Sequence, residues 1–266
     1  MVRSKSFDES DLVLKGEMSN NKPENLNSAD KGRFATTHWS VVLAAGSPES
    51  SQYRDALEAL CRTYWYPIYV YIRRLGYDTQ QAEDCTQAFF TQMLEKQYLG
   101  KIEQKPGRFR TFLLVVLKHF LADQRDKDEA IKRGAGKKFM PLEVGTAETR
   151  YSMEPQDYLT PERLFERSWA LTVLEKTMDR LEAELAGANK QSLFDSLKAY
   201  LCGETTSIPY REVAAQFGMT EGAVKVSVHR LRRRYREILR DEIAQTVNTS
   251  EQIDEEIKEL FESLSF

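Results

Sequence analysis

The chain has 266 residues, of which 30% are charged, and a formal net charge of −3. No apolar run reaches the length of a transmembrane segment, and the N-terminus carries no apolar signal-peptide core. We therefore expect a cytoplasmic protein that does not enter a membrane. Because the chain as a whole is not basic, any attraction to nucleic acid must come from a local cationic region. The length allows two modest domains.

Cysteine and histidine usage points away from disulfides and metal sites. The chain has three cysteines and three histidines, with no CxxC pair and no spacing typical of metal ligands. We expect buried free thiols in a reducing cytoplasm, no metal site and no cofactor. Few segments alternate apolar and polar residues as strands do, which favours an all-α fold.

The first 33 residues are mostly polar and charged, a composition that predicts a disordered N-terminal extension. The character of the sequence changes at Phe34. Thr37 is placed to cap a short helix that carries Trp39, Val42 and Leu43.

Two helices are expected directly after this short one. The first covers about 51–64. The second starts at Tyr66, has Pro67 in its first turn, and ends near Gly76. The aromatic residues at their junction are typical of a core rather than of a cofactor site.

Two further helices flank a polar, cationic loop at 97–108. The earlier one is capped by Thr79 and runs to about residue 96, with a buried apolar stripe. The later one runs over about 109–133. Its first half is apolar enough for a core, and its second half is polar, so we expect it to leave the domain and meet a partner.

A linker is predicted at 141–160, because glycine, proline and weak periodicity mark this stretch. It separates a first domain at 34–140 from a second at 161–247. The second domain opens with a helix capped by Thr160 that runs to about residue 185, followed by a shorter helix capped by Asn189.

The stretch 209–240 has the pattern of a helix-turn-helix. Pro209 suits the first turn of a helix, Gly218 suits a sharp turn that needs a positive φ, and Thr220 is a good cap for the second helix. The second helix carries one inward stripe with cationic residues on its other faces. The stripe consists of Val224, Val228, Leu231 and Tyr235.

An arginine-rich helix by itself is usually a solvated face, but the short helix and glycine turn before this one favour DNA binding. We expect Thr220, Lys225, Val226 and His229 to face the major groove. Phosphate contacts, which position a domain without reading sequence, are expected from Arg230, Arg232, Arg233, Arg234 and Arg236.

The tail at 248–266 is predicted to form an acidic amphipathic helix. Such a short helix is unlikely to stand alone in water. It is expected either to pack as an extra helix or to mask a cationic surface as an autoinhibitory segment. Its apolar stripe consists of Ile253, Ile257, Leu260, Phe261 and Leu264.

Two separated stretches together resemble one family. AEDCTQAFF followed by GRFRTFLLVVLKHFLADQRDK is similar to domain 2 of bacterial sigma factors of the extracytoplasmic-function group. YREVAAQFGMTEGAVKVSVHRLRRRYRE resembles their domain 4. FATTHWSVVLAA and TYWYPIYVYIRRLGY resemble a subgroup known from planctomycete-like bacteria. The resemblance implies two small helical domains, sigma domain 2 and sigma domain 4, joined by a linker.

The resemblance also implies roles for particular residues. Asp84, Gln87 and Phe90 match positions that dock on the clamp helices of RNA polymerase. The loop at 97–108 corresponds to the one that captures a flipped base of the −10 element, and the helix-turn-helix would read the −35 element. The residues implied in −10 binding are Lys101, Lys105, Arg108, Arg110, Lys118, His119, Asp123, Gln124 and Arg125.

These features predict an initiation factor that binds core RNA polymerase and promoter DNA and catalyses nothing itself. An anti-sigma factor or another regulator is a candidate third partner. One alternative is a helix-turn-helix transcriptional regulator whose N-terminal domain senses a ligand or a protein. Polymerase binding by residues 51–140 would separate the two. An enzyme with an appended DNA-binding domain lacks support, since no glycine-rich phosphate loop or nucleophile–base motif is present.

Overall fold

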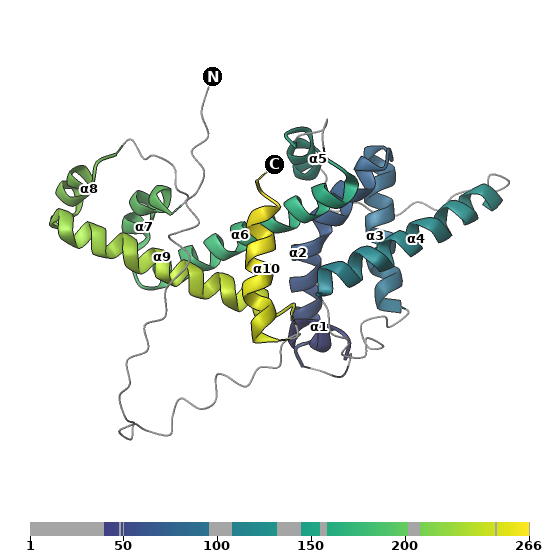
Figure 1. The fold of residues 1–266 in the computed structure, drawn as a ribbon, viewed down its shortest axis with the longest axis horizontal. Helices are drawn as coiled ribbons and strands as arrows, with labels where there is room; N and C mark the ends of the chain where they lie inside the picture. The colour runs from purple at the N-terminus through teal and green to yellow at the C-terminus, as the bar shows by residue number, and fades with distance from the viewer. Residues whose placement is uncertain are drawn as a thin grey trace. The chain divides into compact units, whose positions relative to one another are not determined.

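The computed structural model describes residues 40–47, 49, 51–95, 108–131, 145–154, 159–201, 208–247 and 249–265. Every regular element of these residues is a helix, which confirms the expected all-α class (Figure 1). The described chain divides into a helix-turn-helix unit, residues 185–233, and a large unit, residues 40–184 and 234–265. No helix in the described ranges is long and apolar enough to cross a membrane.

The large unit begins with α1 (Ser40–Ala45) and α2 (Tyr53–Arg74). The predicted break at Tyr66 was wrong, because α2 is one helix with Pro67 inside it. An interior proline costs about 3 kcal/mol through a lost hydrogen bond and a steric clash. Between Tyr64 and Ile72 every residue except Trp65 is buried. Each large apolar side chain so buried contributes about 1.5–3 kcal/mol, which outweighs the cost of the proline.

Helix α3 (Thr79–Glu95) begins near the predicted position, but its cap is Asp78 rather than Thr79. Asp78 Oδ1 accepts a hydrogen bond from the Gln81 N–H at 2.8 Å, and Gln81 Oε1 accepts one from the Asp78 N–H at 3.1 Å. This reciprocal pair is a capping box. Helix α4 (Phe109–Ile131) follows the prediction, with a buried first half.

Helix α5 (Gly145–Ser152) lies within the stretch predicted as a linker. Its Glu148 carboxylate accepts hydrogen bonds from Arg73 Nη2 at 2.7 Å and Nε at 3.1 Å. Arg150 lies over the ring of Tyr66, 4.2 Å from the centroid. These polar contacts hold the helix to α2 together with the side chains of Ala147 and Tyr151, which are buried in the core.

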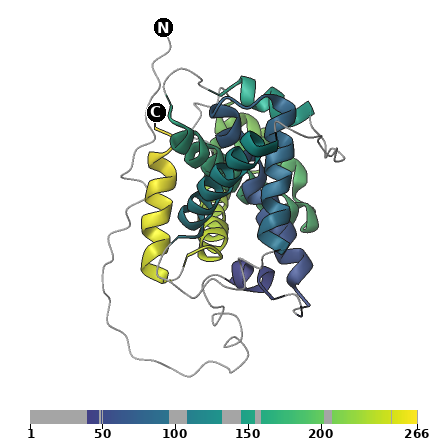
Figure 2. The ribbon, with the colours of Figure 1, turned by 90° about the vertical axis from the view of Figure 1, so that its right-hand side faces the viewer.

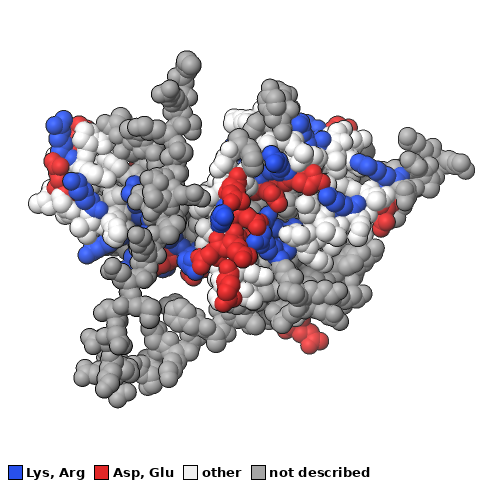
Figure 3. Space-filling model, in the orientation of Figure 1, with Lys and Arg blue, Asp and Glu red and all other residues white. Residues whose placement is uncertain are grey.

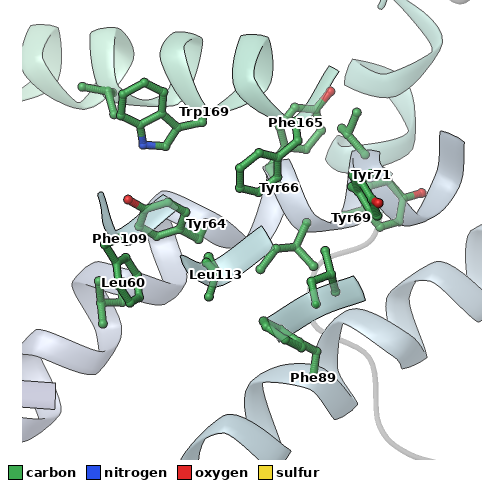
Figure 4. Close-up of a cluster of buried hydrophobic side chains, with 14 of the residues drawn as sticks. Leu60, Tyr64, Tyr66, Tyr69, Tyr71, Phe89, Phe109, Leu113, Phe165 and Trp169 are labelled. Atoms are coloured by element: carbon green, nitrogen blue, oxygen red, sulfur yellow. The ribbon is translucent and has the colours of Figure 1, made fainter. Parts of the chain in front are cut away.

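Helix α6 (Pro161–Gly187) is capped by Thr160 as expected, since Thr160 Oγ1 accepts the Arg163 N–H at 3.3 Å. Its first part packs on the aromatic residues of α2, with Trp169 and Phe165 facing Tyr64 and Tyr66 (Figure 4). This part of α6 therefore belongs to the same core as α2–α4. The compact units thus divide the chain differently from the boundary predicted at 160/161. The buried residues from this part of α6 are Leu164, Phe165, Ser168, Trp169, Ala170 and Val173.

The helix-turn-helix unit contains α7 (Gln191–Leu197), the 3-10 turn η2 (Lys198–Tyr200), α8 (Tyr210–Phe217) and the first part of α9 (Glu221–Ala244). Asn189 does not cap α7. It has a φ of 56° and follows the end of α6, because asparagine tolerates the left-handed conformation that often terminates a helix.

The last helix, α10 (Ser250–Glu262), occupies the stretch predicted for the acidic tail. Figure 2 shows it along one side of the other helices of the large unit. Ile253 and Leu260 are buried in the core of that unit, and Ile257, Phe261 and Leu264 are partly buried against it. The apolar stripe of α10 thus packs on the protein itself.

Candidate nucleic-acid interface

The helix-turn-helix forms as its sequence indicates. Gly218 ends α8 with a φ of +61°, in the left-handed region that glycine adopts without strain. The Met219 N–H donates to the Ala214 carbonyl at 2.9 Å, which closes the turn. Thr220 Oγ1 accepts the Ala223 N–H at 3.2 Å and so caps α9.

A small apolar core lies between α8 and α9. Val213 and Ala214 of α8 are buried, and so are Val224, Val228 and Leu231 of the predicted stripe of α9, whereas Tyr235 of that stripe is half-buried. The inward stripe therefore leaves the opposite side of α9 for solvent or a partner.

Aromatic and polar contacts add to the same unit. Tyr200 stacks on Tyr210 with ring centroids 4.9 Å apart, and its hydroxyl donates to the Ile208 carbonyl at 2.5 Å. Arg232 Nη2 donates to the Tyr200 carbonyl at 2.9 Å. Arg232, predicted to contact phosphate, therefore also stabilises the unit that presents α9.

The first half of α9 presents a cationic surface. Lys225, His229 and Arg230 are exposed, and so is Val226, at 49% of its possible area. Spaced at i, i+1, i+4 and i+5, these residues share one side of the helix. Exposed polar, cationic and small apolar side chains near the start of the second helix are what reading of base edges in the major groove requires. Figure 3 shows lysine and arginine side chains on this part of the surface.

Further along α9 the arginines lie in different surroundings. Arg234, in the large unit, donates to both oxygens of Glu184 at 2.7 and 2.8 Å and to Glu237 at 3.1 Å. These hydrogen bonds raise the pKa of Arg234 and lower that of Glu184. Arg233 is exposed and Arg236 is half-buried. The predicted phosphate contacts therefore differ in how readily they can reach DNA.

The residues predicted to meet polymerase lie on α3. Asp84 is exposed and accepts a hydrogen bond from Gln80 Nε2 at 3.2 Å, and Gln87 is half-buried. Phe90 is buried, with its ring 5.7 Å from that of Phe89. Asp84 and Gln87 are accessible to a partner, whereas Phe90 contributes to the core.

Two residues predicted to bind the −10 region are covered by α10. Arg110 is only 5% exposed, and its Nε lies 2.7 Å from Glu256, which is 1% exposed. Arg108 Nε lies 2.8 Å from the same carboxylate, and both arginines also bind Glu259. In this structure neither guanidinium is open to a phosphate.

The part of α4 at residues 118–125 carries more exposed polar side chains. Lys118 pairs with Glu162 at 2.8 Å, and this hydrogen bond raises the pKa of Lys118. His119, Asp123 and Arg125 are exposed, and Gln124 is half-buried. The remaining predicted residues, Lys101 and Lys105, lie outside the described residues. So do the N-terminal extension and most of the loop at 97–108.

Sequence reasoning missed the role of Glu256. The prediction placed it on the acidic outer face of α10, but it lies between buried Ile253 and Leu260. The signal was present in the spacing, because a glutamate three residues after one stripe position and four before another faces inward on a helix. A carboxylate there requires a cationic partner.

Among the described residues, no group of three or more His, Cys, Asp or Glu side chains could hold a metal ion. Comparisons of the chain with protein-family models, with curated proteins and with solved structures find no match.

Proposed function

We propose that this protein is a sigma factor of the extracytoplasmic-function type, which binds core RNA polymerase and directs it to promoters. The observation that carries the proposal is the helix-turn-helix, in which Lys225, His229 and Arg230 are exposed on one side of α9. A second polar surface on α3 supports a protein partner in addition to DNA.

Each surface has a distinct task in this proposal. The start of α9 reads the −35 element by contacts to base edges, and neighbouring arginines hold the phosphates. Asp84 and Gln87 of α3 bind the polymerase clamp. The exposed part of α4, including His119 and Arg125, lies against the −10 region, where cations hold the separated backbone.

A helix-turn-helix regulator without polymerase binding is the second candidate. It is favoured by the covering of Arg108 and Arg110, since a regulator needs no −10 contact from α4. Its large unit would then serve to bind a ligand or a protein. The two candidates differ in whether the chain binds core polymerase.

The test combines the purified full chain with bacterial core polymerase. A sigma factor should form a stable complex and give defined transcription starts on genomic DNA. Asp84→Ala combined with Gln87→Ala should weaken the complex at least tenfold and change thermal stability little, since surface changes usually cost less than about 0.5 kcal/mol. The matched control is Asp55→Ala, which removes an exposed carboxylate of α2.

Absence of a complex with the wild-type chain would overturn the sigma-factor proposal and leave the regulator. Equal losses from the α3 pair and from the α2 control would remove the assignment of the clamp surface to α3.

A further inference from the structure

Four arginines surround α10, and we call them the arginine cradle. Arg110 belongs to α4 and Arg108 directly precedes it, while Arg167 comes from α6 and Arg240 from α9. Arg108 and Arg110 hold Glu256 at 2.8 and 2.7 Å and share Glu259. Arg240 pairs with Asp254 in the first half of α10, and Arg167 Nη1 donates to the carbonyl of Leu264, just after α10, at 3.4 Å.

The charge of α10 complements the cradle. The helix SEQIDEEIKELFE carries six carboxylates against the one ammonium of Lys258. Acidic side chains gather over the large unit in Figure 3, directly beside lysine or arginine side chains. Residues three or four apart on a helix have Cβ atoms about 5–6 Å from each other, so carboxylates at this spacing share one side and present a line of negative charge.

The docking of α10 does not require the ion pairs between its carboxylates and the arginine cradle. Ile253 and Leu260 already bury α10 in the core. Placing Arg110 and Glu256 in the same interface costs desolvation of both charges, and well-packed apolar residues in place of such a pair are often as stable or more so. The cations therefore call for an explanation beyond holding α10 in place.

The position of Arg108 and Arg110 suggests a further role for these cations. Arg108 and Arg110 lie at the N-terminus of α4, where the helix dipole adds further positive potential. The start of a helix favours anions, and arginine guanidinium groups bind phosphate in the same bidentate geometry as carboxylate. With α10 removed, this end of α4 would be a strongly positive surface suited to a polyanion.

We propose that the arginine cradle is a binding surface for the phosphodiester backbone of DNA, and that α10 occupies it in the free protein as an internal competitor. This inference rests on the proposed function, because DNA is the polyanion which that function supplies. DNA gains access only when α10 leaves, and a partner that binds the open form better shifts the equilibrium towards it.

The first test measures binding of the full chain to a fluorescent oligodeoxythymidine, which offers backbone without a major groove. Glu259→Gln removes a carboxylate shared by Arg108 and Arg110. Glu262→Gln removes the same charge from an exposed site paired with Lys258. At about 50 mM salt we expect the first variant to bind about fivefold more tightly than the second, with a salt dependence steeper by about one unit.

A double variant tests whether the gain in oligonucleotide affinity of Glu259→Gln comes from the arginine cradle. Arg108→Gln combined with Glu259→Gln should return the affinity to that of the wild-type chain. Equal affinities of Glu259→Gln and Glu262→Gln would overturn the proposal.

A second measurement needs no variant. Amide hydrogen exchange of residues 250–262 in the wild-type chain should become faster when the oligonucleotide is added, because a displaced helix loses protection. Unchanged or slower exchange at saturating oligonucleotide would overturn the proposal, and this result decides the matter if Glu259→Gln lowers helix content.

The inference and the proposed function can fail separately. A chain that initiates transcription but shows no difference between the two glutamate variants loses the inference alone. A chain that releases α10 on binding the oligonucleotide but never binds core polymerase retains the cradle and loses the sigma-factor role.

Discussion

Arginines occur both at the start of α4 and along the first half of α9, but their surroundings differ. Arg110 is enclosed by Glu256, Glu259 and the ring of Trp169, 4.8 Å from its guanidinium carbon. Arg230 is exposed to solvent. The contrast shows that, in the free protein, the carboxylates packed beside a cation decide whether it is buried in the fold or open to a partner.

Among the variants that test this comparison, Arg110→Ala should have the largest effect, which is a loss of unfolding free energy. Arg110→Ala leaves buried Glu256 with Arg108 as its remaining cation, so the loss of unfolding free energy should approach the lower end of the range of about 3–5 kcal/mol that a fully unpaired buried charge costs. Chemical denaturation followed by circular dichroism measures the loss. Arg230→Ala is the control, expected within about 0.5 kcal/mol of the wild type. Similar stabilities for the two variants would contradict the contrast.

DNA binding tests the exposed cations in the first half of α9. Lys225→Ala should change the base preference at one position of the −35 element, at a cost of about 1–3 kcal/mol there. Arg230→Ala should weaken binding to all sequences and flatten the salt dependence by about one unit. Binding assays against a randomised −35 library at two salt concentrations measure both effects. A uniform loss from both variants would show that Lys225 does not read sequence.

The turn that presents α9 allows a smaller, local test. Gly218 has a φ of +61° and open space around it, so Gly218→Ala adds only the left-handed strain of about 1–2 kcal/mol. Gly222 lies inside α9, where alanine is favoured by about 1 kcal/mol. We expect the first variant to lower and the second to raise the protection of α9 amides from exchange. The same sign for both would contradict the turn geometry.

The smallest effect is a pH dependence of the docking of α10. The hydrogen bond from Arg108, followed by the nearby charges of both arginines, lowers the pKa of Glu259 from its usual 4.5. A carboxyl with a lowered pKa in the folded state stabilises it above pH 4.5, and this contribution is lost as the pH falls through the folded value. Below about pH 4.5 the exchange protection of α10 should decline more steeply in the wild type than in Glu259→Gln. Parallel declines would show that Glu259 does not contribute.

Local patterns in the sequence predicted most helices and the turn. Gly218, Thr220 and the stripe from Val224 to Leu231 act through neighbours within one or two helical turns, so their geometry follows from spacing. The helices α3, α4 and α6 follow from the same reasoning.

Contacts between distant segments could not be predicted in this way. The local sequence around Arg110 does not show that its guanidinium binds Glu256, which follows it by 146 residues. The continuity of α2 through Pro67 likewise depends on burial supplied by other helices. The packing of α6 on α2 joins stretches that the sequence assigned to different domains.

The position of Trp169 gives the protein an optical reporter of its own. The chain has three tryptophans, and this one is buried with its ring facing the Arg110 guanidinium. The emission of an indole responds to the local electric field and to nearby water. While Glu256 and Glu259 neutralise the guanidinium, Trp169 should emit at short wavelength. Departure of α10 would admit water and leave an uncompensated positive charge at the ring, so the spectrum should change without any attached dye.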